Sequence, residues 1–422
     1  MVSSRENGTQ RAATMAIVVA ALGYFVDIYD LILFGTVRRP SLMELGYTTK
    51  EALTDQGLFL FNCQMTGLLV GGILWGVLGD KRGRLSVLFG SIITYSIANL
   101  ANGAVDTVNQ YAVCRVVAGI GLAGELGAGI TLVSELMDKQ RRGVATAIVA
   151  GFGICGGVAA GLVGGGIPSI YEGAHWRTAY YIGGGLGLAL LVLRIGVVES
   201  GMFKTTASTT VSRGNFFALF SSWRRVLRYL GLICVGVPVW YVIGILVTFS
   251  DRVGGALGVP DPRPATALLC TYAGAAIGDL ASGLVSQGLG SRKRALAIFL
   301  GSTVLSVAGY FTIGSTSLTA FYVMCGVMGL TAGYWAVFVT VAAEQFGTNL
   351  RATVATTTPN FVRGSAVLLA IGFEELAGPL GIVGSAVAVG VFAIGIALVG
   401  LIGLRETFGV DLDYVEPDEP GP

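Results

Sequence analysis

Residues 76–84 read Gly-Val-Leu-Gly-Asp-Lys-Arg-Gly-Arg, and they close a long apolar run. Residues 283–293 read Gly-Leu-Val-Ser-Gln-Gly-Leu-Gly-Ser-Arg-Lys and close a second apolar run with the same glycine spacing. Each stretch therefore places glycines and basic residues in a short connection between two hydrophobic segments. Two copies of one pattern, far apart in the chain, indicate an internal repeat of the kind on which membrane transporters are built.

Further matches continue this repeat in both halves of the chain. Glu135 stands seven residues before Arg142, and Glu344 stands seven residues before Arg351. After the first arginine the chain reads Gly-Val-Ala-Thr, and after the second it reads Ala-Thr-Val-Ala-Thr. The offset is nearly constant, so we interpret the chain as two related halves.

The composition indicates a membrane protein. Hydrophobic residues make up 53% of the 422 positions and charged residues only 12%, whereas a soluble globular chain carries roughly 25% charge. The net charge of +2 gives no sign of a nucleic-acid partner. All six cysteines fall in apolar runs without a CxxC pair, so we expect no disulfide framework, metal site or cofactor.

Twelve apolar runs approach the length of about 20 residues that a membrane-spanning helix needs. They cover residues 13–36, 57–79, 85–104, 108–134, 143–167, 178–198, 229–250, 265–287, 294–314, 318–343, 353–377 and 380–404. We predict an N-terminal six-helix bundle (1–198), a cytoplasmic linker (199–228), a C-terminal six-helix bundle (229–404) and a disordered acidic tail (405–422).

Most lysines and arginines fall in the even-numbered connections and at the termini. Cytoplasmic loops of membrane proteins carry an excess of these residues. We therefore predict a multi-pass protein of a cell inner membrane with both termini in the cytoplasm. The one histidine, His175, falls in an odd-numbered connection, where we expect it to be solvated.

Residues 76–84 resemble the loop signature G-x-x-x-D-[RK]-x-G-[RK] of the major facilitator superfamily, and every defined position is filled from Gly76 to Arg84. The second copy has Gln287 in place of the aspartate. The resemblance implies an all-α membrane fold with twelve transmembrane helices in two pseudo-symmetric bundles. It also implies transport by alternating access to a site between the bundles.

Three shorter segments resemble particular branches of that superfamily. Residues 27–31 are similar to the D-x-[YF]-D-L of metabolite:proton and aromatic-acid:proton symporters, and residues 115–125 are similar to their fourth helix. Residues 344–351 resemble a motif shared with organic-ion and sugar carriers, with Gly347 in place of its proline. Arg363 lies where related organic anion carriers have an arginine that contacts the anion.

Charged residues inside the apolar runs are the candidates for proton coupling, because a charge within a bilayer is costly unless it meets a partner or water. Asp27 and Asp30 lie three residues apart and share one helix face. Two carboxylates in a low dielectric cannot both ionise cheaply, which suits a proton carrier. We predict this role for Asp27, Asp30 and Glu125; the alternative is a structural ion pair, such as Asp30 with Arg115.

Arg363 is the candidate for binding an anionic substrate, because a planar guanidinium matches the geometry of a carboxylate. The alternative is a salt bridge to a carboxylate of the first span. The other substrate candidates are polar or aromatic residues on cavity-lining helices of the superfamily. They are Asn360, Tyr29, Trp240, Tyr241, Tyr334, Trp335 and Gln64. Asp279, in the eighth span, suits packing or gating as well as a substrate role.

A cluster of charges at the cytoplasmic helix ends is predicted to form a gate. Its members resemble the residues that clamp neighbouring helices of the superfamily when the protein opens outward. They are Asp80, Lys81, Arg84, Glu135, Arg142, Glu344 and Arg351.

The pattern as a whole predicts a monomeric, proton-coupled symporter of a small organic anion, either a monocarboxylate or an aromatic acid. A proton-coupled exporter of drugs or organic cations is the alternative within the same class. A membrane-embedded enzyme or a sensor is the alternative from another class. No nucleophile–base pair or sizeable soluble segment supports that alternative, so the prediction is that the chain is not an enzyme.

Overall fold

The computed structural model describes residues 2–82, 84–125, 142–167, 175–199 and 216–410, and the secondary structure within these ranges is helical. The N-terminal half contains α1 (Val2–Glu44), α2 (Lys50–Arg82), α3 (Arg84–Asn102), α4 (Val108–Leu122), α6 (Arg142–Val163) and α7 (Trp176–Glu199). The C-terminal half contains η1 (Phe216–Phe220), α8 (Trp223–Trp240), the π-helical η2 (Tyr241–Val247), α9 (Ser250–Ala256), α10 (Pro264–Leu289), α11 (Arg292–Thr312), η3 (Gly314–Thr316), α12 (Leu318–Ala332), α13 (Trp335–Glu344) and α14 (Thr348–Gly403).

Eight helical stretches in the described residues are long and apolar enough to cross a membrane. The last of them, 353–403, carries two of the predicted spans, and its backbone breaks at Gly381, where φ is 69°. Helices α3, α4 and α6 lie where three more spans were predicted. The total of twelve stays a prediction, whereas the all-helical, multi-span architecture is confirmed.

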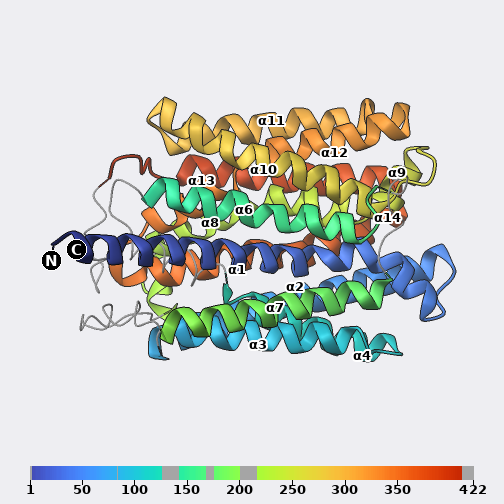
Figure 1. The fold of residues 1–422 in the computed structure, drawn as a ribbon. Helices are drawn as coiled ribbons and strands as arrows, with labels where there is room; N and C mark the ends of the chain where they lie inside the picture. The colour runs from blue at the N-terminus through green and yellow to red at the C-terminus, as the bar shows by residue number, and fades with distance from the viewer. Residues whose placement is uncertain (1, 83, 126–141, 168–174, 200–215, 411–422) are drawn as a thin grey trace.

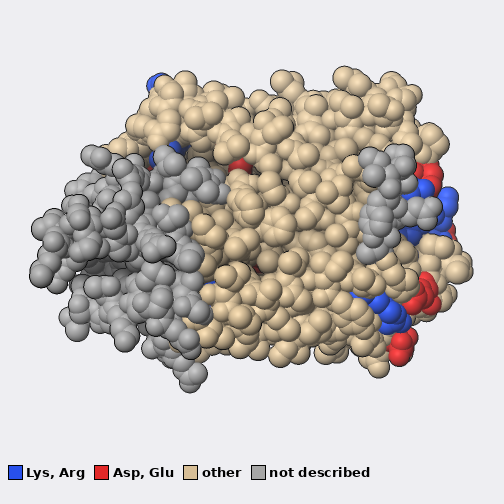
Figure 2. Space-filling view, viewed as in Figure 1, with Lys and Arg blue, Asp and Glu red and all other residues tan. Residues whose placement is uncertain are grey.

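The helices run side by side along one common direction (Figure 1). In that view α11 and α12 lie along one edge and α3 and α4 along the other, with α1, α6 and α8 between them. Figure 2 shows a broad band of uncharged residues over the middle of the molecule and charged side chains at the right-hand end. This distribution suits a bundle whose middle faces lipid.

The two halves meet along two helix pairs, α2 with α14 and α6 with α10. Glycines allow the close approach: a Cβ atom at Gly157 would strike the ring of Tyr272, and one at Gly364 would strike Leu69. Without a hydrophobic force between helices in lipid, small residues at such contacts provide the packing. These glycine contacts fix how near the halves can come.

The chain after α14 packs against the start of α11. Glu406 accepts hydrogen bonds from the backbone amides of Arg292 and Lys293, at 2.9 and 3.2 Å, and from the hydroxyl of Ser291. Burial alone would raise the pKa of Glu406, but these bonds and one from the amide of Phe408 lower it to about 2. Glu406 therefore acts as a negative cap on α11. Residues 411–422 lie outside the described part of the chain.

We predict that Glu406→Ala lowers the stability of the protein by about 1 kcal/mol, the scale of a lost helix N-cap. Because the folded-state pKa is depressed, the contribution is present above the ordinary glutamate pKa and fades as the pH falls towards 2. Thermal unfolding of both proteins in detergent at pH 7 and at pH 4 measures this. A difference in melting temperature between wild type and Glu406→Ala that is larger at pH 4 than at pH 7 would contradict the prediction.

Candidate functional site

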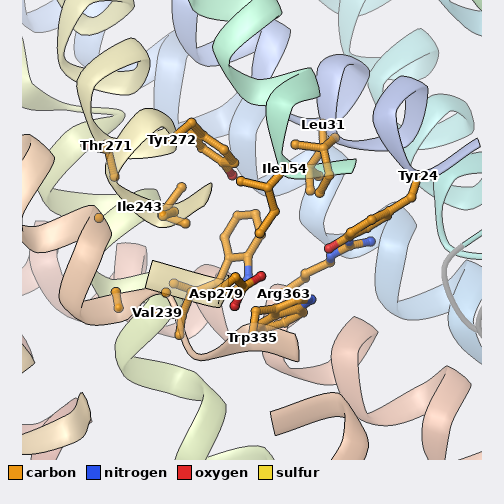
Figure 3. A pocket seen from close by; sticks show the side chains of 16 residues that line it. Tyr24, Leu31, Ile154, Val239, Ile243, Thr271, Tyr272, Asp279, Trp335 and Arg363 are labelled. Carbon is orange, nitrogen blue, oxygen red and sulfur yellow. The ribbon is translucent and has the colours of Figure 1, made fainter. Parts of the chain in front are cut away.

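A cavity lies between the two halves, with about 490 Å³ of empty space that includes the part open to solvent. Helices α1 and α6 border it from the N-terminal half, and α8, η2, α10, α12, α13 and α14 border it from the other half. Its lining is mostly apolar and aromatic, and its charged members are Asp279 and Arg363 (Figure 3). A site of this composition suits a small organic molecule that carries few polar groups.

Arg363 on α14 forms an ion pair with Asp27 on α1, with 3.2 Å between Nη2 and Oδ2. Both side chains are almost fully buried, with exposures of 1% and 0%. Among the described residues, Nε and Nη1 of Arg363 and Oδ1 of Asp27 have no hydrogen-bond partner. The pair therefore joins the two halves beside the cavity and leaves part of the guanidinium free to bind an anion.

Asp30 does not share this site. It is buried against α7, where a Cβ atom at Gly183 would strike its Oδ1, and neither of its oxygens has a hydrogen-bond partner among the described residues. Arg115 bonds instead to Oε1 of Gln64 and stacks 5.1 Å from the ring centre of Phe34. The direct Asp30–Arg115 ion pair, which was the alternative, is absent from the described ion pairs.

Glu125 forms a buried ion pair with Arg194 of α7, a residue that the sequence analysis did not select. Nη1 of Arg194 lies 3.1 Å from Oε2 of Glu125, and Nη2 contacts Oε1. Ser91 adds a hydrogen bond of 3.4 Å. A Cβ atom at Gly23 would strike both partners, so glycine there permits α1 to pass beside them. The contacts make Glu125 a brace between the end of α4, which it follows, and α7, separate from the Asp27–Arg363 pair.

The remaining substrate candidates divide into two groups. Trp240 and Trp335 line the cavity. Five others lie outside it in this conformation, and each donates a hydrogen bond to a backbone carbonyl of a neighbouring helix. These are Tyr29, Tyr241, Tyr334, Gln64 and Asn360. The tyrosines that line the cavity are instead Tyr24 and Tyr272.

Only part of the predicted gate lies among the described side chains. Glu344 accepts a hydrogen bond of 2.7 Å from Thr407 and lies 3.6 Å from Nε of Arg292. Arg351 donates to the backbone oxygen of Ala343. The other five predicted members lie outside the described side chains. They are Asp80, Lys81, Arg84, Glu135 and Arg142.

A second ion pair joins the halves at the end of the bundle opposite the start of α1, which we call the far end. Nη2 of Arg38 lies 2.7 and 2.8 Å from the two carboxylate oxygens of Asp251, and Arg38 is only 2% exposed. The guanidinium also lies over the ring of Phe249 at 4.6 Å. The lysines and arginines that the sequence analysis used only for orientation thus include Arg38, which joins the halves at the far end.

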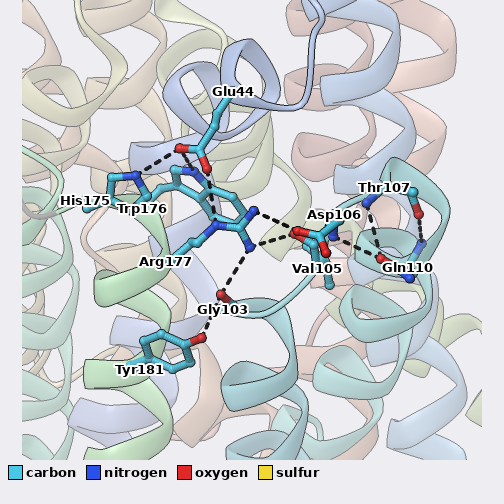
Figure 4. A network of polar contacts seen from close by, with 10 residues as sticks. All are labelled: Glu44, Gly103, Val105, Asp106, Thr107, Gln110, His175, Trp176, Arg177 and Tyr181. Carbon is cyan, nitrogen blue, oxygen red and sulfur yellow. Dashed lines mark hydrogen bonds and ion pairs between the residues drawn. The ribbon is translucent and has the colours of Figure 1, made fainter.

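Polar contacts at the far end also tie the helices of the N-terminal half to one another (Figure 4). Glu44 at the end of α1 contacts Arg177 at 3.2 Å, Trp176 at 2.7 Å and Nε2 of His175 at 2.9 Å. His175 is 56% exposed, in keeping with the expectation that it is solvated, and it also contacts Glu44. Arg177 reaches on to Asp106, so α1, α7 and the connection before α4 are linked.

The structure has a cavity between two helical halves, and ion pairs join one half to the other. These features are typical of polytopic membrane carriers. The family model for the Major Facilitator Superfamily matches residues 20–371, and the chain belongs to this superfamily. It is a multi-pass membrane transporter rather than an enzyme.

Several relatives share a large part of the chain's length. A Haemophilus influenzae protein whose name assigns it to metabolite transport is 26% identical over 92% of each chain. The Escherichia coli sialic acid transporter NanX is 25% identical over 82% of each chain. The Escherichia coli 3-(3-hydroxy-phenyl)propionate transporter is 25% identical over 82% of this chain and 81% of its own length.

We predict that Glu125→Gln destabilises the protein by about 3–5 kcal/mol, because it leaves the buried Arg194 without a counter-charge. The double variant Glu125→Gln/Arg194→Met removes both charges and should recover most of the lost melting temperature in detergent. Glu51→Gln, at an exposed position, is the matched control. A Glu125→Gln protein that is fully stable but has lost proton-dependent uptake would instead make Glu125 a coupling residue.

Proposed function

We propose that the protein is a proton-coupled symporter of a small organic anion, which works by alternating access as a monomer in a cell inner membrane. The observation that carries the proposal is the Asp27–Arg363 pair, which joins the halves beside the cavity at 3.2 Å. The relatives named as transporters of sialic acid and of 3-(3-hydroxy-phenyl)propionate support an acid as the substrate.

Competition for one guanidinium would couple the substrate to the proton. A substrate carboxylate can bind the free Nε and Nη1 of Arg363, but Asp27 already supplies one negative charge there. Two anions on one arginine in an apolar site are unfavourable, whereas a protonated Asp27 leaves the arginine to the substrate. The proton and the anion would then enter together, and their binding would leave the net charge of the site unchanged. With both bound, the protein could change from one open state to the other.

The second inter-half ion pair supports a site that opens alternately to the two sides. With both termini in the cytoplasm, the far end faces outward, and Arg38 with Asp251 closes it in this conformation. The pair lies on α1 and α9, one helix from each half. Breaking it would release the outer ends of the two bundles, while the Asp27–Arg363 pair sits deeper in the interface.

Export of organic cations is the second candidate function, and one carboxylate in the cavity favours it. Asp279 presents a carboxylate oxygen without a partner among the described residues, and it borders the cavity. A cation there would also face Arg363, which lines the same cavity and repels it. The charge balance of the cavity therefore favours the anion.

We predict that the purified protein in liposomes accumulates a labelled aromatic acid under an inward proton gradient. Arg363→Ala should reduce binding at least about tenfold, the loss expected for a hydrogen bond to a charged group. Asp27→Asn, which imitates the protonated acid, should keep exchange of labelled for unlabelled substrate but lose gradient-driven accumulation. Gradient-driven accumulation by Asp27→Asn, or uptake of organic cations in place of acids, would overturn the proposal.

We also predict that Asp251→Asn loosens the far end. Cysteines placed at Arg39 and Asp261, whose side chains meet across the halves, report on it when the six native cysteines are replaced. A flexible bifunctional maleimide should link the two cysteines several-fold less efficiently in the Asp251→Asn background. Glu374→Gln, which breaks a pair with Arg252 inside one half, is the matched control. Equal linking in all three proteins would contradict the prediction.

A further inference from the structure

Asp279 is held so that one oxygen is used and the other is free. Its Oδ1 accepts a 3.0 Å hydrogen bond from the backbone amide of Ala336, in the first turn of α13. Its Oδ2 is buried and has no hydrogen-bond partner among the described residues. The hydrogen bond to α13 explains the orientation of the carboxylate. Because Asp279 borders the cavity, its Oδ2 is an acceptor available to a bound molecule.

A buried carboxylate oxygen without a partner is costly, so it points to a group that the structure does not contain. Asp279 is only 3% exposed, and it forms no ion pair with Arg363 or any other described residue. Trp335, beside it in Figure 3, also lines the cavity. The cavity thus offers two separate polar positions: a guanidinium for an anion and a carboxylate for a hydrogen-bond donor.

We propose that Asp279 determines substrate specificity by accepting a hydrogen bond from a donor group that the substrate carries in addition to its carboxylate. This inference rests on the proposed function, because it takes Arg363 as the position of the substrate's carboxylate. The lining also includes the aromatic side chains of Tyr24, Trp240 and Tyr272, and such side chains suit a substrate with a flat ring. A ring hydroxyl and a ring-borne ammonium group are the two sources of such a donor.

A site with a buried acceptor discriminates strongly, because a substrate without the donor leaves that acceptor desolvated and unpaired. The hydroxylated acid is therefore expected to bind at least about tenfold tighter than the same acid without the hydroxyl, since hydrogen bonds to charged groups are the strong ones. An ammonium group would add a charge attraction to Asp279 but would also be repelled by Arg363. The hydroxylated and aminomethyl probes distinguish these two sources.

The test measures equilibrium binding of 3-phenylpropionate, its three ring-hydroxylated isomers and its ring-aminomethyl analogues to the purified full-length protein. The key variant is Asp279→Asn. Its amide oxygen can still accept the Ala336 bond, so the cavity receives an N–H donor in place of the acceptor. We expect the preference for the donor-bearing acid to disappear in this variant, so that the dissociation constants of the hydroxylated acid and of 3-phenylpropionate become nearly equal. Glu374→Gln makes the same chemical change outside the cavity and should retain the preference.

The outcomes separate this inference from the proposed function. If acids bind in an Arg363-dependent way but no donor-bearing probe binds more tightly, the inference fails and the proposed function stands. The inference also fails if Asp279→Asn keeps the preference but loses the proton dependence of uptake, because Asp279 is then a proton carrier. If no acid binds and Arg363→Ala changes nothing, the proposed function fails first.

Discussion

The ion pair between Arg363 and Asp27 is the constraint on which the cavity depends. Both groups are buried in an apolar bundle, where an unpaired charge is costly and a pair recovers only part of the desolvation penalty. Neither residue can therefore leave the other unless a proton or a second charge takes its place. Because the partners come from α14 and α1, that exchange acts directly on the contact between the two halves.

The other buried charges differ in whether they cross between the halves. Glu125 with Arg194, and Arg115 with Gln64, lie within the N-terminal half and brace its helices against one another. Arg38 with Asp251 crosses the halves, as Asp27 with Arg363 does. A carrier that rocks needs lasting contacts inside each bundle and breakable ones between bundles. Buried polar residues in this fold thus serve two purposes that residue type alone does not distinguish.

This difference explains how far the sequence could predict the site. Apolar length and the doubled glycine motif predicted the helical, multi-span architecture. The salt bridge of Arg363 to a carboxylate of the first span, which was the alternative to substrate binding, is present as the pair with Asp27, while the substrate-binding role of Arg363 stays a prediction. The partners of Glu125 and Arg38 could not be predicted, because a span that is apolar on all sides gives depth but not the direction in which a side chain points. For the same reason the sequence could not show that the hydroxyls of Tyr29, Tyr241 and Tyr334 each donate to a backbone carbonyl of a neighbouring helix.

In the C-terminal half two of the helical stretches that border the cavity are interrupted, α8 with η2 and α12 with α13, whereas α1 and α6 border it without a break. Pro238 in α8 is followed by the π-helical η2, and Thr248 and Tyr310 bond carbonyls of that segment. In an apolar bundle such irregular backbone persists where side chains satisfy its freed polar groups. The α12–α13 break at Gly333 likewise supplies the amide that orients Asp279. The N-terminal half therefore contributes Asp27 to the ion pair with Arg363. The C-terminal half contributes most of the cavity lining, including Arg363 and Asp279.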